Sequence, residues 1–389
     1  MGKRKVLIAA SNYWTSPFKV GSHHYAREFA RMGWQVAFIS DPISPLHFLF
    51  ARSAELFQRY DIWKSGPASD LGGNLLSYVP LTILAPHNKA ILRSSCVAKY
   101  WPIWTLPNVH NIIRKMDFEE VDLLWFDSIT QSFWLDVIKY KKSVLRIADK
   151  NIGFTKNTVA IQAMEHELIG KADLVVYTAK NLAGYIKSYK PKLMSYVPNG
   201  VNIENFTDGK HAVPSEYTNI PEPRVIYVGA IEDWFDLNLV KYCAESLPDV
   251  SFVLIGPPKI DTSSLTGLKN VFLLGSRRYE QLPGYLSNSQ VGIIPFIKNH
   301  PVVNSIHPIK LYEYLACGLT VVSVGWEELN EIKLNFFRAD NYNQFVNFIK
   351  TGIENKDTEK QNLKLYSWEK ATEKILKLIN FNDPTKENA

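Results

Sequence analysis

The sequence has few cysteines and no long apolar run, and these absences exclude several classes of protein. Its 389 residues include three cysteines, Cys96, Cys243 and Cys317, which are too widely spaced for a disulfide framework or a metal-binding pair. No stretch of about eighteen apolar residues is present that would span a membrane. The first apolar run, Val6–Ala10, is too short for a signal peptide. We therefore expect a protein of the reducing cytoplasm without an export signal.

Three ligand-binding motifs are also missing. The chain has neither the Gly-x-Gly-x-x-Gly turn of dinucleotide-binding domains nor the Gly-x-x-x-x-Gly-Lys-Ser/Thr loop of P-loop enzymes. It lacks an Asp-x-Asp triplet that would hold a divalent ion against a diphosphate, and the nearest match, Asp117–Glu119, is typical of a solvated segment before a strand. If a nucleoside diphosphate binds, Lys and Arg side chains and helix N-termini must meet its charge. We expect no metal and no cofactor.

Size and composition indicate a globular protein of two domains. A chain of 389 residues exceeds what one hydrophobic core usually organises. The net charge of +6 suits an anionic substrate, an anionic membrane surface or nucleic acid, and the charge alone does not choose among them. No basic stripe or aromatic RNA-binding motif is present, so nucleic acid is the least expected of these partners.

Basic and aromatic residues mix in the first half of the chain, in residues 46–52 and 99–104. This mixture fits a surface that rests among lipid headgroups, where aromatic rings and cations are both favoured. Core packing is the alternative for these aromatic side chains, because large aromatics dominate protein cores.

Short apolar strands alternate with helices along the chain, which predicts an α/β fold with parallel sheets covered on both faces. Helical insertions are expected between residues 41 and 115. In the first half we expect strands at 5–11, 34–40, 121–126, 143–148 and 174–177 and helices at 22–32, 159–169 and 180–188. In the second half we expect strands at 224–228, 251–255, 271–274, 291–295 and 320–324 and helices at 236–246, 279–287, 308–318 and 367–379.

A polar, proline-rich stretch at residues 207–223 has the composition of an interdomain linker. We therefore predict one Rossmann-like, doubly wound domain over residues 1–206 and a second over 224–365. Residues 366–389 are expected to form a helix and tail that pack back on the first domain. Two such domains in tandem predict a cleft between them, because ligands of these sheets sit beyond the carboxyl ends of the strands.

The most informative segment runs from His307 to Gly318 and predicts a short helix. Pro308 suits the first turn, and Gly318 suits the left-handed position just past the helix end. Lys310 lies in the first turn, where free backbone N–H groups favour an anion, and Glu313 lies on the same face three residues later. A cation for phosphate and an acceptor for sugar hydroxyls thus point the same way. The alternative is a solvated ion pair between these two residues.

Two α/β domains, no metal motif and a late Pro-x-Lys-x-x-Glu element followed by a Val-rich strand resemble the GT-B glycosyltransferases. More narrowly, the chain is similar to the membrane-associated glucuronosyltransferase of xanthan assembly and related exopolysaccharide transferases. The stretches that carry this resemblance are 11–25, 146–149, 228–233 and 310–313.

The resemblance implies transfer of a sugar from a nucleotide diphosphate donor, such as UDP-glucuronate or another UDP-sugar, to a lipid-linked oligosaccharide. The first domain would bind the acceptor and the second the donor, at the cytoplasmic face of the inner membrane, with peripheral membrane association. Lys310 would neutralise the donor diphosphate, and Glu313 would accept hydrogen bonds from the ribose.

The resemblance extends to two further donor-binding elements. Gly229 and Ala230 would let the backbone approach the nucleotide, although a plain turn at a strand end is the alternative for Gly229. Arg277 or Arg278 would lie near the base or the phosphates, unless both belong to a solvated face.

Asp149 directly follows the predicted strand 143–148 and resembles the catalytic Asp of the xanthan enzyme. An inverting transfer needs a carboxylate to deprotonate the acceptor hydroxyl, and a buried Asp with a raised pKa suits this role. A helix N-cap or a partner for Arg146 is the alternative. His23 is a second candidate to orient or deprotonate the acceptor, or else a packed polar residue. Ser305 stands where retaining GT-B enzymes usually carry a second Glu, which favours inversion.

Two other functions remain open. A nucleotide-sugar epimerase of the same fold would act on the donor without an acceptor. A non-catalytic polysaccharide-binding or assembly subunit would keep the fold and lose turnover.

Overall fold

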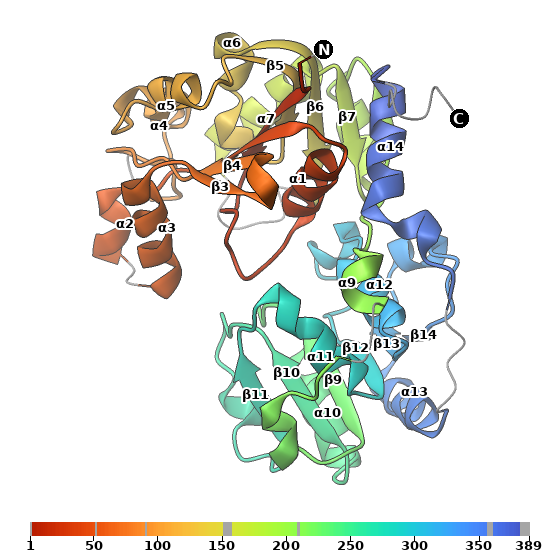
Figure 1. The fold of residues 1–389 in the computed structure, drawn as a ribbon. Coiled ribbons are helices and arrows are strands. Elements are labelled where there is room, and N and C mark those ends of the chain that lie inside the picture. Colours follow the sequence, from red (N-terminus) through yellow and green to blue (C-terminus); the bar gives the residue numbers. More distant parts are fainter. Residues whose placement is uncertain are drawn as a thin grey trace. The chain divides into compact units, whose positions relative to one another are not determined.

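The computed structural model describes residues 2–50, 53–89, 92–150, 158–207, 211–355 and 361–381. These residues form two compact units (Figure 1). The first unit comprises the chain up to Pro198 together with the segment from Ala371 onward, and the second comprises Asn199–Lys370. Each unit is built on one largely parallel sheet with helices around it, so the predicted α/β fold with two Rossmann-like domains is confirmed.

The sheet of the first unit has eight strands in the order β3-β4-β2-β1-β5-β6-β7-β8, all parallel except β3. Its strands are β1 Lys5–Ala10, β2 Gln35–Ser40, β3 Ala68–Asp70, β4 Leu75–Tyr78, β5 Glu120–Phe126, β6 Lys139–Ile147, β7 Leu174–Tyr177 and β8 Met194–Tyr196. In the centre, Ile8 of β1 is paired with Phe38 of β2 and with Trp125 of β5. The central strands are apolar because helices cover both faces of a parallel sheet.

The helices of the first unit include the insertions expected between residues 41 and 115. They are α1 Gly21–Arg31, α2 Pro45–Phe50, α3 Ala54–Ser65, α4 Ser95–Tyr100, α5 Val109–Lys115, α6 Trp134–Val137, α7 Val159–Lys171 and α8 Leu182–Lys187. Helices α2 to α5 fall in the insertion region, and strands β3 and β4, which the sequence does not predict, lie between them.

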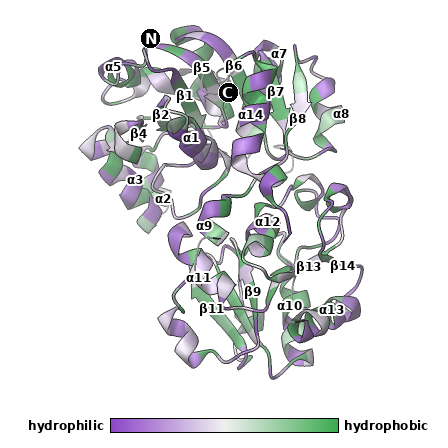
Figure 2. Ribbon diagram, turned by 45° about the vertical axis from the view of Figure 1, so that its right-hand side comes forward, coloured by the Kyte–Doolittle hydropathy of each residue, from purple (hydrophilic) through white to green (hydrophobic). Residues whose placement is uncertain are grey.

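The sheet of the second unit has six parallel strands in the order β11-β10-β9-β12-β13-β14. The strands are β9 Arg224–Val228, β10 Ser251–Ile255, β11 Val271–Gly275, β12 Val291–Ile294, β13 Thr320–Val324 and β14 Phe337–Ala339. The helices are α9 Ile203–Thr207, α10 Leu237–Ser246, α11 Leu282–Ser287, α12 Ile309–Ala316 and α13 Tyr342–Glu354. Strands such as β9 and β11 are hydrophobic (Figure 2).

The unit boundary lies at Pro198, whereas the sequence predicts a boundary at residue 206 followed by a linker. The difference arises because α9 joins the core of the second unit, where the ring of Phe206 is buried. The Cys317 thiol, directly after α12, lies 3.7 Å from the Phe206 carbonyl oxygen. Helix α9 is therefore part of the second unit.

The last helix, α14 Trp368–Leu378, crosses the boundary between the units, which falls at Lys370. Within the first unit it runs beside β7 (Figure 1), and Lys374 Nζ donates a hydrogen bond to the Tyr196 carbonyl oxygen at 2.7 Å. Phe381, just after the helix, packs edge-on against Trp34. The chain thus returns to the first unit after completing the second.

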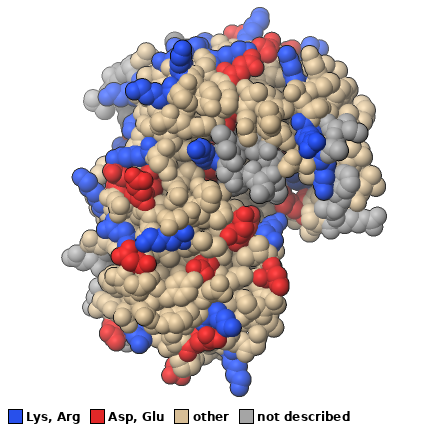
Figure 3. All heavy atoms as spheres, turned by 180° about the vertical axis from the view of Figure 1, so that it is seen from behind, with Lys and Arg blue, Asp and Glu red and all other residues tan. Residues whose placement is uncertain are grey.

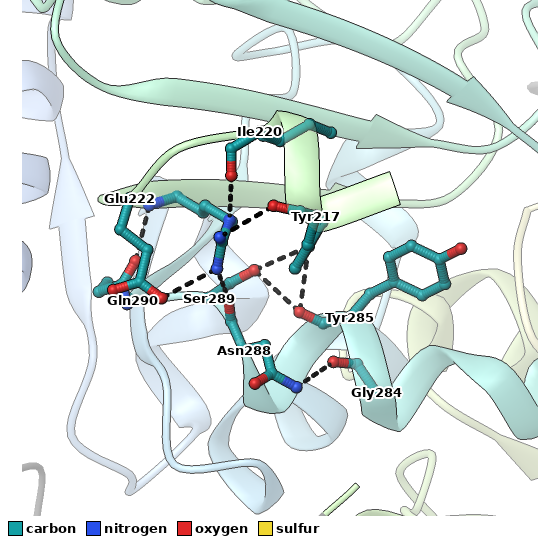
Figure 4. Close-up of polar contacts among 9 residues, drawn as sticks. Tyr217, Ile220, Glu222, Gly284, Tyr285, Asn288, Ser289 and Gln290 are labelled. Atoms are coloured by element: carbon teal, nitrogen blue, oxygen red, sulfur yellow. Dashed lines mark hydrogen bonds and ion pairs between the residues drawn. The ribbon is translucent and has the colours of Figure 1, made fainter. Parts of the chain in front are cut away.

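Arg224 stabilises the start of the second sheet through polar contacts with Ile220, Glu222 and Asn288, which are labelled in Figure 4. Its guanidinium donates to the carbonyl oxygens of Ile220 and Asn288 at 2.8 and 3.0 Å and forms an ion pair of 2.9 Å with Glu222. It also lies 4.4 Å from the ring centroid of Tyr217. One buried cation thereby joins the segment before β9 to the end of α11.

Candidate active site

The predicted helix at 308–318 is present as α12 with both expected ends. Pro308 is its N-cap, and Gly318 has a φ of 79° just past its C-terminus. The N–H groups of Gly318 and Leu319 donate to the carbonyl oxygens of Leu315 and Tyr314, each at 3.1 Å, which is the Schellman pattern of helix ends. Both ends of α12 are therefore defined, and Lys310 lies in its first turn.

Lys310, in that first turn, is partly buried and held between two aromatic rings. Its Nζ lies 4.9 Å from the ring centroid of Tyr227 and 4.6 Å from that of Phe296. Burial lowers the pKa of Lys310 to about 8, and the nearby Glu313 carboxyl opposes this shift. Among the residues that the structure describes, no carboxylate forms an ion pair with Lys310. Within the described part of the chain, this ammonium is therefore flanked by two rings and has no ion-pair partner.

Glu313 is buried one helical turn further on. Burial raises its pKa to about 7, while a hydrogen bond from Tyr279 and the charge of Lys310 act in the opposite direction. A solvated ion pair between Lys310 and Glu313 does not describe this geometry, because the carboxyl is buried. Both groups titrate near neutral pH, so a ligand with an anionic and a hydroxyl-rich part would meet both.

Two glycines allow close packing at the ends of β9 and β10, and the first of them lies beside Lys310. Gly229, which follows β9, has a φ of 150°, and a Cβ atom there would lie 3.1 Å from Lys310 Nζ. Gly256, which follows β10, has a φ of 147°, and a Cβ atom there would lie 1.8 Å from the Gly229 carbonyl oxygen. Next to them, the Ala230 carbonyl oxygen accepts a hydrogen bond of 2.9 Å from the Tyr227 hydroxyl. The predicted donor residues Gly229, Ala230 and Lys310 are thus neighbours.

The two arginines after β11 differ in their surroundings. Arg277 donates to Glu216 and to the Tyr285 hydroxyl, both at 2.8 Å, and to the Leu274 carbonyl oxygen at 2.5 Å. Its guanidinium is therefore engaged in holding the loop after β11. Arg278 is exposed and is the one of the pair that a ligand would reach without breaking these bonds.

The first unit carries a polar cavity of about 320 Å³ where β1, β2, β5 and β6 end. Carboxyl ends of neighbouring parallel strands are where α/β sheets bind ligands. The polar side chains that line the cavity belong to Ser11, Ser22, Asp41, Asp127, Ser128, Thr130, Arg146 and Asp149.

A buried ion pair forms one wall of this cavity. Arg146 Nη1 donates to Asp127 Oδ1 at 2.9 Å, and Trp125 Nε1 donates to Asp127 Oδ2 at 3.1 Å. The chain leaves room for the guanidinium at Gly21, where a Cβ atom would lie 2.4 Å from the Arg146 guanidinium carbon. Asp127 is thus the ion-pair partner of Arg146, and the positive charge of Arg146 also acts on the Asp149 carboxyl.

Asp149 is partly buried in the cavity. Burial raises its pKa to about 6, and the positive charge of Arg146 opposes the rise. Its carboxyl accepts no hydrogen bond from the described residues. Helix α7 is capped by Thr158, whose hydroxyl accepts from the Ile161 N–H, so Asp149 is not the N-cap of that helix. A carboxylate with a pKa near 6 that faces a polar cavity can act as a general base.

His23 occupies a different environment from Asp149. It is fully buried in α1, its Nε2 lies 2.9 Å from the Tyr13 carbonyl oxygen, and its Nδ1 accepts from the Val20 N–H at 3.2 Å. Burial lowers its pKa to about 3. Both ring nitrogens are thus used to fix the start of α1, and His23 is not among the residues that line the cavity.

Three cavity residues, Asp41, Ser128 and Thr130, are not predicted as site residues from the sequence. Their signal is the one that identifies Asp149, because Asp41 follows β2 directly and Ser128 follows β5 within two residues. What the sequence does not give is the order of the strands, which brings these four ends to one place.

Within the described residues, neither a cluster of metal-ligating side chains nor a membrane-spanning helix is present. No group of three or more His, Cys, Asp and Glu side chains there is arranged to hold a metal ion. None of the helices described is both long enough and apolar enough to cross a bilayer.

Family models match both units. Residues 7–178 match the model of the N-terminal domain of the glucuronosyltransferase GumK, and residues 222–352 match the model of the group 1 glycosyl transferases. By family and fold, the chain is a GT-B glycosyltransferase. The polar cavity thus lies in the half of this glycosyltransferase that resembles GumK, and Lys310 lies in the group 1 half.

This glycosyltransferase is also similar to a curated protein, the putative teichuronic acid biosynthesis glycosyltransferase TuaH of Bacillus subtilis (strain 168). The two are 29% identical over 171 residues, which cover 42% of this chain and 43% of TuaH. The alignment therefore spans less than half the length of that relative.

Solved structures share the fold over nearly the whole glycosyltransferase chain. Sucrose-phosphate synthase from Thermosynechococcus elongatus is similar with a TM-score of 0.67 and 14% identity, covering 97% of this chain and 98% of that one. Anabaena Alr3699/HepE in complex with UDP and glucose is similar with a TM-score of 0.60 and 14% identity, covering 99% of each chain. At these identities the likeness establishes the fold.

Proposed function

We propose that this chain transfers one sugar from a UDP-sugar to a lipid-linked saccharide during the synthesis of a cell-surface or exported polysaccharide. The observation that carries the proposal is Lys310, an ammonium held by two aromatic rings at the N-terminus of α12, with no ion-pair partner among the described residues. A diphosphate supplies the missing anion, and the free N–H groups of the helix start favour it as well.

The donor chemistry rests on the second unit. The β-phosphate of UDP leaves with the bonding electron pair when the glycosidic bond to the donor breaks, and Lys310 stabilises that negative charge. Glu313, buried three residues further on, accepts from the ribose hydroxyls. HepE, a protein of similar fold, has been solved with UDP and glucose, and the match of the first unit to GumK makes UDP-glucuronate a candidate donor. The exposed Arg278 is the arginine that we place near the nucleotide.

Asp149 is the general base of the proposed reaction. Its carboxylate accepts the proton of the acceptor hydroxyl while that oxygen attacks the anomeric carbon, which inverts the configuration there. The buried Ser305 hydroxyl, which donates to the Val302 carbonyl oxygen at 3.0 Å, stands where a retaining enzyme would present a carboxylate. Proton NMR of the anomeric centre of the product distinguishes the two outcomes, and a retained configuration would remove Asp149 from the role of base.

The lipid-linked acceptor and the cytoplasmic face of the inner membrane also belong to the proposal. They are supported by exposed apolar side chains of the first unit, such as Leu49 and Ile103, which are 77% and 63% exposed, and by the Lys99 ammonium over the Tyr100 ring. Such surfaces favour headgroup regions of bilayers. On the face drawn in Figure 3, the basic and acidic side chains that are described are interspersed, which is not the pattern of a nucleic-acid interface.

Calorimetry with UDP tests the donor site. Lys310→Ala removes a charge-assisted contact of about 1.5–3 kcal/mol and should weaken UDP binding roughly 10- to 150-fold. Lys350→Ala, which removes an exposed lysine from α13 of the same unit, is the matched control and should bind UDP like the wild type. The measurement is made in EDTA, because we propose that no metal is needed. Unchanged UDP affinity in Lys310→Ala would refute the donor site.

The remaining alternatives are separated by two assays. A nucleotide-sugar epimerase would convert UDP-N-acetylglucosamine without any acceptor, whereas the proposed transferase leaves it unchanged apart from slow hydrolysis. A non-catalytic subunit would bind glycan and never release UDP, whether Asp149 is present or replaced. For the transferase, Asp149→Asn keeps UDP affinity and loses turnover.

A further inference from the structure

Asp41 is fixed in the polar cavity of the first unit by an unusual number of contacts to one oxygen. Its Oδ1 accepts hydrogen bonds from Ser128 Oγ at 2.5 Å, Thr130 Oγ1 at 2.9 Å and Gln131 Nε2 at 3.1 Å. The amide of Gln131, which is fully buried, also donates to the Ala10 carbonyl oxygen at the end of β1. The carboxyl of Asp41 is therefore tied to the ends of two strands.

The backbone of Asp41 is held as firmly as its side chain. Its N–H donates to the Ala10 carbonyl oxygen at 2.9 Å, and its own carbonyl oxygen accepts from the Arg59 guanidinium at 2.7 Å. The second carboxyl oxygen, Oδ2, has no hydrogen-bond partner among the described residues. A carboxyl that is fixed by one oxygen and open at the other is preorganised to accept a hydrogen bond from a ligand.

The charges around the cavity favour a particular class of ligand. Three carboxyl groups line it, and both oxygens of Asp127 are already engaged by Arg146 and Trp125. Arg146, the cation of the described lining, is consumed by that ion pair, and Arg59 binds the main chain of Asp41. Acceptor oxygens of Asp41 and Asp149 are thus offered to hydroxyl groups. Burial raises the pKa of the Asp41 carboxyl, whereas the hydrogen bonds from Ser128, Gln131 and Thr130 favour its charged form. When these carboxyl groups are ionised, a further negative charge in the cavity would be repelled.

We propose that Asp41 is an acceptor-binding residue that selects an uncharged sugar. Its Oδ2 accepts a hydrogen bond from a hydroxyl of the acceptor sugar whose reacting hydroxyl faces Asp149, and its negative charge rejects a uronic acid. A cavity of about 320 Å³ falls at the small end of ligand sites, which begin at roughly 300 Å³, and suits one sugar ring. This inference rests on the proposed function, because it assigns the acceptor to the site of Asp149.

The test measures sugar binding directly, by saturation-transfer NMR without donor or turnover. The probes are two matched pairs of methyl glycosides, glucoside with glucuronide and galactoside with galacturonide, which differ within each pair only by a carboxylate at C6. The wild type should bind at least one neutral member about tenfold more tightly than its uronide, as expected for rejection of a like charge.

Asp41→Asn is the decisive variant, because the amide oxygen can still accept from Ser128, Thr130 and Gln131 while an NH₂ group replaces the open oxygen. It should bind the neutral glycosides at least fivefold more weakly and lose most of the preference over the uronides. Asp61→Asn, which neutralises an exposed carboxylate on α3, should behave like the wild type. Asp41→Glu keeps the negative charge and moves it by one methylene, so it should still reject the uronides. If the melting temperature of Asp41→Asn differs from that of the wild type, Asp41→Glu replaces it in the binding measurement.

Two outcomes would overturn the proposal. One is a wild type that binds no neutral glycoside or prefers the uronides, and the other is an Asp41→Asn protein with unchanged affinity and preference. Because no UDP-sugar is used, loss of the transferase proposal and loss of the acceptor proposal are separate results. A protein that prefers neutral glycosides through Asp41 and fails to bind UDP would keep this inference and refute the donor site.

Discussion

Single residues on both candidate surfaces are held close to their titration points near neutral pH. Burial raises the pKa of Asp149 to about 6 and that of Glu313 to about 7, and it lowers that of Lys310 to about 8. Groups poised in this way exchange protons with little free-energy cost at cellular pH. The pH dependence of binding and turnover therefore reports on them directly.

Turnover should depend on the charge of Asp149. The proposed general base must be ionised to accept a proton, so kcat should rise with pH along a limb centred near pH 6 and level off above it. Steady-state rates between pH 5 and pH 8 measure this limb. Asp149→Asn should show only residual turnover with no limb there, and a wild-type rate in that variant would refute the assignment.

The same shift fixes the sign of a stability effect. The folded pKa of Asp149, about 6, lies above the value of about 3.9 for an unfolded chain. The free energy of unfolding therefore includes a stabilising contribution from protonated Asp149 that is fully present below pH 4 and is lost as the pH rises through 6. Asp149→Asn should therefore be more stable than the wild type at pH 8, by urea denaturation, and the advantage should shrink at pH 4.5. An Asn variant that is less stable at both pH values would contradict this account.

Binding of UDP should be accompanied by proton uptake at Lys310. With a pKa of about 8 in the free protein, this amine is about half protonated at pH 8, and a diphosphate beside it raises the pKa. Calorimetric enthalpies in buffers of different ionisation enthalpy should report up to about half a proton taken up at pH 8. Lys310→Ala should show no uptake, and equal uptake in both proteins would place the titrating group elsewhere.

At the scale of elements, the position of helix α1 depends on Gly21, its first residue, which has no side chain. A Cβ atom at Gly21 would lie 2.4 Å from the guanidinium carbon of Arg146, so a side chain there must displace the cation that pairs with Asp127. The start of α1 and the wall of the polar cavity therefore depend on each other.

Gly21→Ala should destabilise the protein by about 1–3 kcal/mol through overpacking and should lower turnover as Arg146 moves. Gly184→Ala is the matched control, because Gly184 also lies in a helix, α8, and a Cβ atom there meets nothing within 4 Å. That change should be neutral or stabilising by about 0.4–1 kcal/mol. Urea denaturation and initial rates measure both, and equal effects of the two changes would argue against the packing role of Gly21.

Elements with a strong local signal are predictable from the sequence. The bounds of β7, β9, β10 and β13 match the predicted ranges, because each is an apolar run between breakers. Strands β3, β8 and β14 have three residues each, too few for a period to show. Helix α13 is absent from the sequence prediction, although Asn341 is a typical N-cap residue and Phe345, Val346 and Ile349 have the spacing of a buried helix face.

The candidate site residues are likewise predictable where a local sequence signal is strong and unpredictable where the fold brings distant segments together. The placement of Lys310 and Glu313 is predictable because one short helix carries both. The contribution of Asp41 is not, since it depends on the strand order β2-β1-β5-β6, which sets four distant segments side by side. The hydrogen bonds that engage both nitrogens of His23 are made to Tyr13 and Val20, and only the folded loop before α1 provides them.

At the scale of the whole molecule, each unit has its own hydrophobic core. Two cores of this size predict two thermal transitions. Since Lys310 belongs to the second unit, saturating UDP should raise the melting temperature of one transition. At a UDP concentration of 100 Kd, binding stabilises the unit that binds it by about 2.7 kcal/mol. Differential scanning calorimetry measures both transitions with and without UDP.

Arg224 identifies which transition belongs to the second unit. Arg224→Met leaves the carbonyl oxygens of Ile220 and Asn288 without their donor, so it should lower the transition that UDP raises and leave the other in place. A single transition that shifts as a whole with UDP would show that the units unfold together.

The path of the chain through α14 sets an order of assembly on the ribosome. Lys374 and Phe381 contribute contacts to the first unit, yet they are synthesised after every residue of the second. The first unit therefore lacks its contacts at β8 and Trp34 while residues 199–381 are translated. This takes roughly ten to forty seconds at 5–20 residues per second. A nascent chain released before Ala371 emerges would carry a complete second unit and an incomplete first unit.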